Sequence, residues 1–132
     1  MTRIGLIGCG MWGRNLARNL AQLDVLGGVA DLVPAHAESF AAEFATSAMN
    51  VTALFEDAGL DGVVIAAAAP THRDLACQAL AAGLHVFVEK PLALDLAEAE
   101  AIAAAAHAAG RQVMVGHLIR YHDAFLALQD QL

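Results

Sequence analysis

Cationic residues are scarce in this chain, since seven Lys and Arg stand against fourteen Asp and Glu, for a formal net charge of −7. No basic run occurs, so the chain lacks the cations that release counterions from nucleic acid or from an anionic membrane. Cysteine is also scarce. Cys9 and Cys77 cannot form a disulfide framework, and their spacing fits no zinc pattern. We expect two buried thiols in a reducing cytoplasm, no metal site and no nucleic-acid partner.

Long hydrophobic runs are absent as well. The longest apolar run, residues 63–70, has about eight residues, whereas a membrane-spanning helix needs about 20. No charged-then-apolar leader with a cleavage site opens the chain, because residues 1–3 lead directly into an apolar, strand-like segment. We therefore expect a cytoplasmic protein without a membrane span. The 132 residues correspond to about one domain, and the apolar fraction of 58% is too high for a disordered chain.

Short apolar segments of strand type alternate with helical segments. The strand candidates are apolar on both faces, as strands buried in a parallel sheet are. They lie at residues 4–8, 28–31, 50–53, 62–67, 85–89 and 112–116. Strand–helix–strand repetition with short loops predicts an α/β fold in which helices cover both faces of a parallel sheet.

The ends of several predicted helices are marked by capping and stop residues. The expected capping boxes and glycine stops are Thr71 with Asp74, Asp95 with Glu98, Gly83, and Gly110. Residues 54–59 form too short a crossover to predict a helix. Residues 121–132 are expected to be helical and to end without a cap.

Residues 8–13 read Gly-Cys-Gly-Met-Trp-Gly, a G-x-G-x-x-G pattern that closes a predicted strand and opens a predicted helix. In this context Gly8 permits a tight turn, Gly10 lets the backbone approach a pyrophosphate, and Gly13 lets the helix lie close to the strand. The helix N-terminus offers free N–H groups and a partial positive charge to the anion. The alternative is a packing turn in a sheet that binds no nucleotide, with Trp12 packed beside it.

Asp31 ends the second predicted strand, about 20 residues beyond the last glycine of the loop. At this spacing a carboxylate can bind both ribose hydroxyls of an adenosine. A 2′-phosphate would meet like charge there, so we expect NAD in preference to NADP. The alternative is a helix-capping or loop aspartate.

Polar residues follow three further predicted strands, at residues 68–72, 89–91 and 116–117. Because ligands bind beyond the carboxyl ends of parallel strands, these loops should meet the glycine loop and Asp31 at one edge of the sheet. Lys90 directly follows a buried apolar strand, where a charge is costly unless it is paired or functional. If burial lowers its pKa, Lys90 can exchange a proton with a substrate hydroxyl, with Glu89 orienting it. The alternative is an ordinary Glu–Lys pair on a loop.

Two histidines belong to the same edge. His117 follows the sixth predicted strand and can bind substrate or shuttle a proton, unless it only ties a loop. His72 can face the cofactor after the fourth strand, unless it is simply the second residue of a capped helix.

Three segments together resemble one known family. They are the glycine loop with Trp12-Gly13, the run Ala-Gly-Leu-His-Val-Phe-Val-Glu-Lys-Pro-Leu-Ala at 82–93, and Val-Gly-His-Leu-Ile-Arg-Tyr-His at 115–122. They are similar to the glucose–fructose oxidoreductase / inositol dehydrogenase / rhizopine catabolism (Gfo/Idh/MocA) family, over nearly the whole chain. The resemblance implies a doubly wound Rossmann domain with six strands in the order 3-2-1-4-5-6. It also implies binding of NAD, or NADP, in a dehydrogenase that transfers hydride to or from a hydroxyl or carbonyl of a sugar, cyclitol or nucleotide sugar.

The same resemblance implies roles for single residues. Lys90, Glu89 and His117 would be catalytic, and the Lys90–Pro91 peptide bond would be cis. The cofactor would be bound by Gly8, Gly10, Met11, Trp12, Gly13, Asp31, Ala67, His72, Glu89 and Lys90.

The chain departs from the family at two points. Many members have Thr-Pro where this chain has Ala67-Ala68, and members carry a second, α+β domain beyond the point where this chain stops. We therefore expect residues 1–120 to form the dinucleotide-binding domain and residues 121–132 to begin a helix leading to that second domain. The isolated chain should then bind cofactor without turnover. The whole protein should be a homo-oligomer that acts on a small-molecule, sugar-type substrate.

Two alternatives stay open at this point. In one, the chain is a stand-alone dinucleotide-binding module, such as a redox sensor or regulatory subunit without turnover. In the other, it is a degenerate relative that serves as an interaction domain, although the intact glycines, Asp31 and Lys90 argue against decay. Titration with NAD separates the last reading from the others.

Overall fold

Six short strands form a parallel sheet in the order β3-β2-β1-β4-β5-β6 within residues 1–131, the part of the chain that the computed structural model describes. They are β1 (Ile4–Ile7), β2 (Leu26–Ala30), β3 (Ala48–Met49), β4 (Gly62–Ile65), β5 (His85–Val88) and β6 (Val113–Val115). Every pairing is parallel, and the order reverses between β1 and β4. The predicted doubly wound Rossmann sheet is confirmed, including its strand order.

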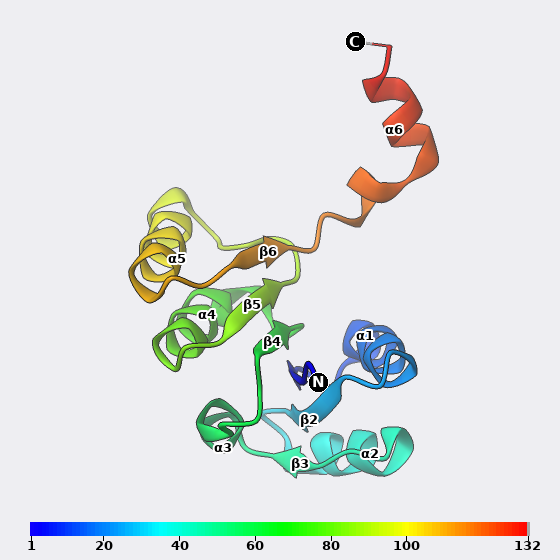
Figure 1. The fold of residues 1–132 in the computed structure, drawn as a ribbon, viewed down its shortest axis with the longest axis vertical. Helices are drawn as coiled ribbons and strands as arrows, with labels where there is room; N and C mark the ends of the chain where they lie inside the picture. Colours follow the sequence, from blue (N-terminus) through cyan, green and yellow to red (C-terminus); the bar gives the residue numbers. More distant parts are fainter. Residues whose placement is uncertain (132) are drawn as a thin grey trace.

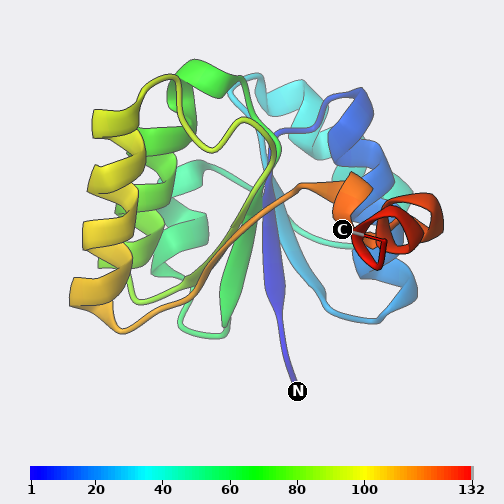
Figure 2. The same ribbon diagram turned by 90° about the horizontal axis from the view of Figure 1, so that it is seen from above.

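Helices cover both faces of the sheet (Figures 1 and 2). On one face lie α1 (Met11–Gln22) and α2 (Pro34–Phe44), and on the other α3 (Val51–Glu56), α4 (His72–Ala81) and α5 (Leu96–Ala109). Two short 3-10 turns, η1 (Ala69–Thr71) and η2 (Leu118–Tyr121), precede α4 and the last helix, α6 (Asp123–Gln129). None of the described helices is long and apolar enough to cross a membrane.

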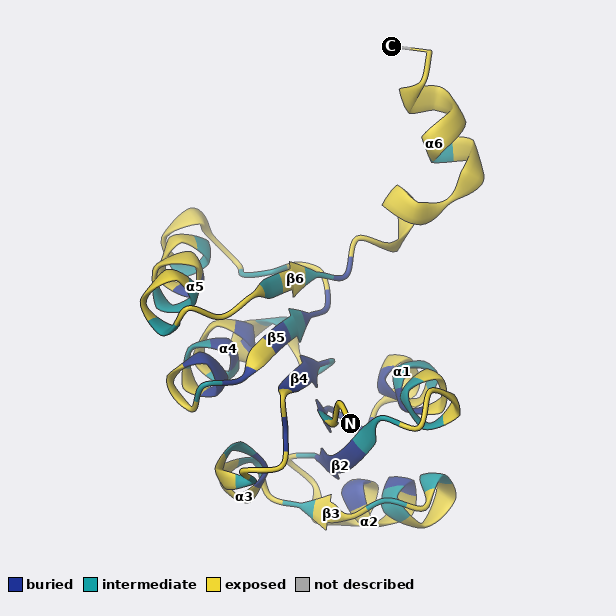
Figure 3. Ribbon diagram, viewed as in Figure 1, coloured by how far each residue is buried: buried dark blue, intermediate teal, exposed yellow. Residues whose placement is uncertain are grey.

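Alternate residues of the central strands enter the two apolar layers, because successive side chains of a strand point to opposite faces. Ile65 packs in the layer of α3, α4 and α5, whereas its neighbour Val64 packs in the layer of α1 and α2. Both are buried, as expected for strands that are covered on each side (Figure 3). Ala17 of α1 and Ala76 of α4 are fully buried, since their small side chains let helices lie close to the sheet.

The prediction of a strand at residues 50–53 is wrong. The strand at this place is the two-residue edge strand β3, and Asn50 instead begins α3 by accepting a hydrogen bond from the Ala53 N–H at 2.8 Å. An N-cap asparagine satisfies a free N–H of the first helical turn, and this outweighs the β-propensity of Val51 and Thr52. The crossover that seemed too short for a helix contains one.

The predicted helix ends are confirmed only in part. Gly83 and Gly110 follow α4 and α5 with φ of 81° and 62°, the left-handed conformation that glycine adopts readily. Asp95 caps α5 by accepting from the Glu98 N–H at 2.8 Å. Thr71 occupies the N-cap position of α4 but forms no capping hydrogen bond, because its hydroxyl instead donates to the Ala68 carbonyl at 2.7 Å.

The C-terminal segment lies apart from the sheet (Figure 1). Residues 118–131 are almost wholly exposed, including Leu118, Ile119 and Leu128 (Figure 3). The helix expected over residues 121–132 is shorter, because η2 takes the first residue and α6 ends at Gln129 with Asp130 as its C-cap. Leu132 lies outside the described residues.

Candidate functional site

The carboxyl ends of the central strands lie in register, so the residues that follow them form one row. Ile7 of β1 is level with Ala30 of β2 and with Ile65 of β4, which is level in turn with Val88 of β5. Val88 is level with Val115 of β6. The next residues in each strand form the row, which runs Asp31, Gly8, Ala66, Glu89 and Gly116. The predicted meeting of five loops at one sheet edge is therefore present.

The glycine loop joins β1 to α1 at the centre of this row. Gly8 has φ of 102°, and a Cβ there would lie 2.5 Å from the Ala66 carbonyl oxygen. A Cβ on Gly13 would overlap the Gly8 carbonyl oxygen, so Gly13 lets α1 begin hard against the strand. Gly10 has no atom within 4 Å of its Cβ position and stands at the N-terminus of α1. The first and last glycines thus serve the fold, while the middle one leaves open space where N–H groups can meet an anion.

Asp31 is fixed at the end of β2 by backbone donors from two directions. Its carboxylate accepts from the Cys9 N–H at 2.7 Å and from the Val33 N–H at 2.9 Å, and the His36 imidazole lies 3.3 Å away. Partial burial acts to raise the pKa of Asp31, but these donors outweigh it and hold the pKa below its ordinary value. Burial, together with the Asp31 charge, raises the pKa of the neighbouring Cys9 thiol to about 12. The site therefore offers an ionised carboxylate beside an inert thiol.

A cavity of about 370 Å³ lies beside the glycine loop and Asp31. Its polar wall is formed by Gly8, Gly10 and Asp31, and its other residues are Ile7, Leu32, Val51, Ala66, Ala67, Ala68, Thr71 and Leu75. Most of the lining is apolar, with the carboxylate at one side. This combination suits a flat heterocycle attached to a sugar diol.

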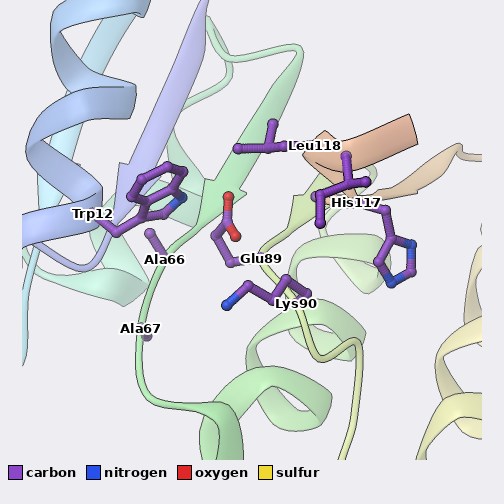
Figure 4. Close-up of a pocket in the computed structure, with 9 residues that line it drawn as sticks. Trp12, Ala66, Ala67, Glu89, Lys90, His117 and Leu118 are labelled. Atoms are coloured by element: carbon purple, nitrogen blue, oxygen red, sulfur yellow. The ribbon is translucent and has the colours of Figure 1, made fainter. Parts of the chain in front are cut away.

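A second cavity, of about 470 Å³, shares Ala66 and Ala67 with the first, and Figure 4 shows its lining. Its lining includes the predicted residues Trp12, Glu89, Lys90 and His117. The two cavities therefore adjoin along this alanine pair.

Glu89 is the buried charged group of the second cavity. It is 6% exposed, and its Oε1 has no hydrogen-bond partner in residues 1–131. A Cβ on Gly116 would lie 2.9 Å from this oxygen, so the glycine leaves room for the carboxylate. A buried acceptor without a partner is costly, which points to a donor supplied from outside the chain.

Lys90 and His117 are both exposed. The burial expected for Lys90 is not found, and its amine forms no hydrogen bond or ion pair with Glu89 or with any other described residue. In Figure 4 the Lys90 amine reaches toward the side of Ala67, while the His117 ring points away from Glu89. The Lys90–Pro91 peptide bond is cis, as the resemblance implied.

Three of the residues expected to bind cofactor line neither cavity, namely Met11, Gly13 and His72. Met11 is 89% exposed on the first turn of α1. His72 is 1% exposed, and its two ring nitrogens lie next to the carbonyl oxygens of Pro91 and Ala67. A direct contact between the His72 side chain and a ligand does not fit this arrangement.

Sequence reasoning missed the apolar residues of the lining. Leu118 and Ile119 close one side of the second cavity, and Leu32, Val51 and Leu75 line the first. Only Leu32 carried a sequence signal, because it directly follows Asp31 at the end of a predicted strand. No group of three or more His, Cys, Asp or Glu within residues 1–131 is placed to hold a metal ion.

Comparison with known families places this geometry in context. Residues 2–117 match the model of an oxidoreductase family with an NAD-binding Rossmann fold, GFO_IDH_MocA. An inositol 2-dehydrogenase from Acidothermus cellulolyticus is 39% identical over an alignment of 137 positions. The alignment covers 98% of this chain and 40% of that enzyme. The chain thus spans about two-fifths of the length of the curated relatives that it matches.

Solved structures of related proteins also superpose on nearly the whole chain. The UDP-N-acetylglucosamine 3-dehydrogenase GnnA from Acidithiobacillus ferrooxidans superposes with a TM-score of 0.91 and 36% identity, over 98% of this chain and 42% of that one. GenD2 from gentamicin A biosynthesis, solved in complex with NAD, superposes with a TM-score of 0.92 and 29% identity, over 99% of this chain and 39% of that one.

Proposed function

The chain belongs to the Gfo/Idh/MocA family of oxidoreductases and is an NAD-binding domain of that family, and we propose that it serves a dehydrogenase that acts on a hydroxyl or carbonyl of a sugar, cyclitol or nucleotide sugar. The observation that carries the proposal is the pair of cavities that share Ala66 and Ala67. One holds the glycine loop and a fixed carboxylate, and the other holds a lysine and a buried glutamate. NAD has two corresponding halves, joined by a pyrophosphate.

The adenosine half is assigned to the cavity of Asp31. The carboxylate would accept hydrogen bonds from the ribose hydroxyls, and the apolar side chains of Leu32, Val51 and Leu75 would surround the base. The N-terminus of α1, with open space at the Cβ position of Gly10, would hold the pyrophosphate. The residues present therefore fit this half of the cofactor.

The nicotinamide half is assigned to the cavity of Trp12 and Glu89. The unpartnered Oε1 of Glu89 supports this assignment, because a carboxamide N–H or a ligand hydroxyl would satisfy it. Glu89 and Lys90 share no hydrogen bond within residues 1–131, so a bound group would have to bridge them for Glu89 to orient the lysine.

When bound, the nicotinamide supplies the two-electron chemistry by taking or giving a hydride. The protein residues position the reactants and handle the proton. Lys90 exchanges the proton of the reacting hydroxyl, Glu89 accepts a hydrogen bond from the group held beside it, and His117 contacts the substrate from the end of β6. Exposure of Lys90 and His117 in the chain leaves this side of the cavity open to a substrate.

The organisation of the whole protein follows from the same assignment. We propose residues 1–120 as the dinucleotide-binding domain and the segment from residue 121, which contains α6, as the connection to a substrate domain. The exposed α6, which stands away from the sheet, supports this division (Figure 1). The substrate domain would complete the pocket, so the isolated chain would bind cofactor without turnover, and the whole protein would be a cytoplasmic homo-oligomer.

Titration of the chain with NAD tests the proposal directly. We expect saturable binding at one site per chain, read as quenching of Trp12, the single tryptophan, which lines the nicotinamide cavity. Calorimetry gives the stoichiometry, and ADP-ribose, which lacks the nicotinamide, should bind while leaving Trp12 emission nearly unchanged. Absence of saturable NAD and NADP binding would overturn the proposal and favour the interaction-domain reading.

Replacement of Asp31 by serine tests the cofactor preference. The wild-type chain should prefer NAD over NADP, because the Asp31 charge repels a 2′-phosphate. Asp31→Ser should weaken NAD binding and strengthen NADP binding, shifting the ratio of the two affinities by roughly a hundredfold, or about 2.7 kcal/mol. Asp24→Ser, which removes an acidic residue of the turn after α1, is the control for net charge.

The same carboxylate fixes the pH dependence. Because the pKa of Asp31 is lowered in the fold, the group stays ionised as the pH falls toward the ordinary aspartate value of about 3.9. NAD affinity should therefore be flat between pH 7 and about pH 5, and should fall only below that. A loss of affinity centred near neutral pH would show that another group controls binding.

A further inference from the structure

His72 is buried where three segments meet. It begins α4, it is 1% exposed, and its ring lies between the loop after β4 and the loop after β5. Its Nδ1 is 2.7 Å from the Pro91 carbonyl oxygen, and its Nε2 is 3.0 Å from the Ala67 carbonyl oxygen. Both distances are those of hydrogen bonds, and the two carbonyls belong to residues 5 and 19 positions away in the chain.

Each of these carbonyls adjoins the proposed nicotinamide cavity. Ala67 lines both cavities. Pro91 directly follows Lys90, which lines the nicotinamide cavity. The His72 ring therefore connects Ala67, in the wall of the cavity, to Pro91, the residue next to Lys90.

A helix-capping role does not explain these contacts. Thr71 occupies the N-cap position of α4, and the His72 side chain bonds to loop carbonyls outside its own helix. Both partners are acceptors, so a neutral imidazole donates to one of them only, whereas an imidazolium donates to both. Either form leaves the ring without a free donor for a ligand, because both nitrogens already face protein oxygens.

We propose that His72 is a positioning residue, which holds the loop of Lys90 at a fixed place relative to the Ala67 wall and so places the Lys90 amine in the nicotinamide cavity. We call His72 with its two carbonyl partners, Ala67 and Pro91, the His72 clamp. This inference rests on the proposed function, because it assigns the clamp a role in binding nicotinamide. It also explains why a buried histidine has both ring nitrogens next to loop carbonyls, beside a cavity in which Oε1 of Glu89 has no partner among the described residues. The adenosine end is held by other elements, the glycine loop and Asp31, so the clamp should act on one half of the ligand only.

Three substitutions separate the two hydrogen bonds. The side-chain N–H₂ of asparagine matches the place of Nδ1 and can keep the bond to Pro91, whereas that of glutamine matches Nε2 and can keep the bond to Ala67. Leucine keeps the bulk and removes both. His107→Leu, at an exposed position of α5, is the matched control.

The first measurement compares affinities for NAD and ADP-ribose in each variant. We expect His72→Leu to bind NAD roughly tenfold more weakly, the loss expected for a buried hydrogen bond, with ADP-ribose binding within about twofold of wild type. His72→Asn should recover most of the NAD affinity, and His72→Gln less, because the bond to Pro91 is the one that reaches Lys90. Retained ADP-ribose binding shows that each variant is folded, and His107→Leu should match wild type for both ligands.

The second measurement reads Lys90 directly, because it is the only lysine in the chain. Reductive ¹³C-methylation, which keeps the charge, gives Lys90 its own NMR signal beside that of the N-terminal amine. NAD should shift the Lys90 signal in wild type and in His72→Asn but not in His72→Leu. Wild-type shifts and an unchanged affinity ratio in all three variants would overturn the positioning role. Failure of the wild-type chain to bind ADP-ribose or NAD would instead overturn the proposed function.

Discussion

Alanine at Gly13 should cost the fold about 2 kcal/mol, whereas alanine at Gly10 should leave the fold intact and remove NAD binding. A Cβ on Gly13 would overlap the Gly8 carbonyl oxygen, a backbone atom that cannot rotate away. Overpacking of this kind costs up to about 3 kcal/mol. The better helix propensity of alanine returns about 1 kcal/mol, so the penalty dominates.

The Gly10 variant has the opposite profile. Its Cβ would meet no atom within 4 Å, and its φ of −83° suits any residue. Alanine there removes a glycine N-cap, which changes stability by no more than about 1 kcal/mol. The methyl group would instead occupy the space through which the pyrophosphate reaches the helix N-terminus, so NAD affinity should fall by at least about tenfold.

Thermal unfolding and NAD titration of the two variants check this pair of expectations. For a domain of this size, a loss of 2 kcal/mol lowers the Tm by about 8 °C. Gly13→Ala should show that decrease, and Gly10→Ala should melt within a few degrees of wild type while binding NAD poorly. Normal NAD affinity in Gly10→Ala would contradict the assignment of the pyrophosphate to this loop.

The sheet could be predicted because its central strands are short, apolar on both faces and punctuated by glycine. Residues such as Val64 and Ile65 need burial on opposite sides, and only a sheet covered by two layers of helices provides it. The edge strand β3 escaped prediction because two residues carry no periodicity. Asn50 was mistaken for strand because the β-branched pair after it has strand propensity, while capping depends on a hydrogen bond to the N–H three residues later.

The sequence predicted which edge of the sheet carries the site, but not which side chains contact one another there. Strand order and register place Asp31, Glu89 and Gly116 in one row. The alternation of strands and helices predicts that these residues share one edge of a parallel sheet, whereas the strand order was implied by the family resemblance. The clamp of His72 could not be foreseen, since it depends on a carbonyl 19 residues away. Nor could the exposure of Lys90 be foreseen, because a lysine has a long side chain that can leave a buried strand end and reach solvent.

Loss of Lys90 should have the largest effect on catalysis. In the whole protein with its substrate domain, Lys90→Ala should lower kcat by about a thousandfold, within the range that a positioned acid or base contributes. Affinity for NAD should fall by no more than about tenfold, as in His72→Leu, because the adenosine half carries most of the binding. Steady-state turnover with cyclitols and nucleotide sugars, beside NAD titration, gives both quantities.

Arginine at the same position separates charge from proton exchange. Lys90→Arg keeps the cation, but a guanidinium stays protonated at any working pH, so it cannot take the proton of the reacting hydroxyl. We expect it to recover substrate affinity and little of kcat. A kcat restored to wild type by arginine would mean that Lys90 acts as a fixed positive charge, and full activity in Lys90→Ala would remove it from the mechanism.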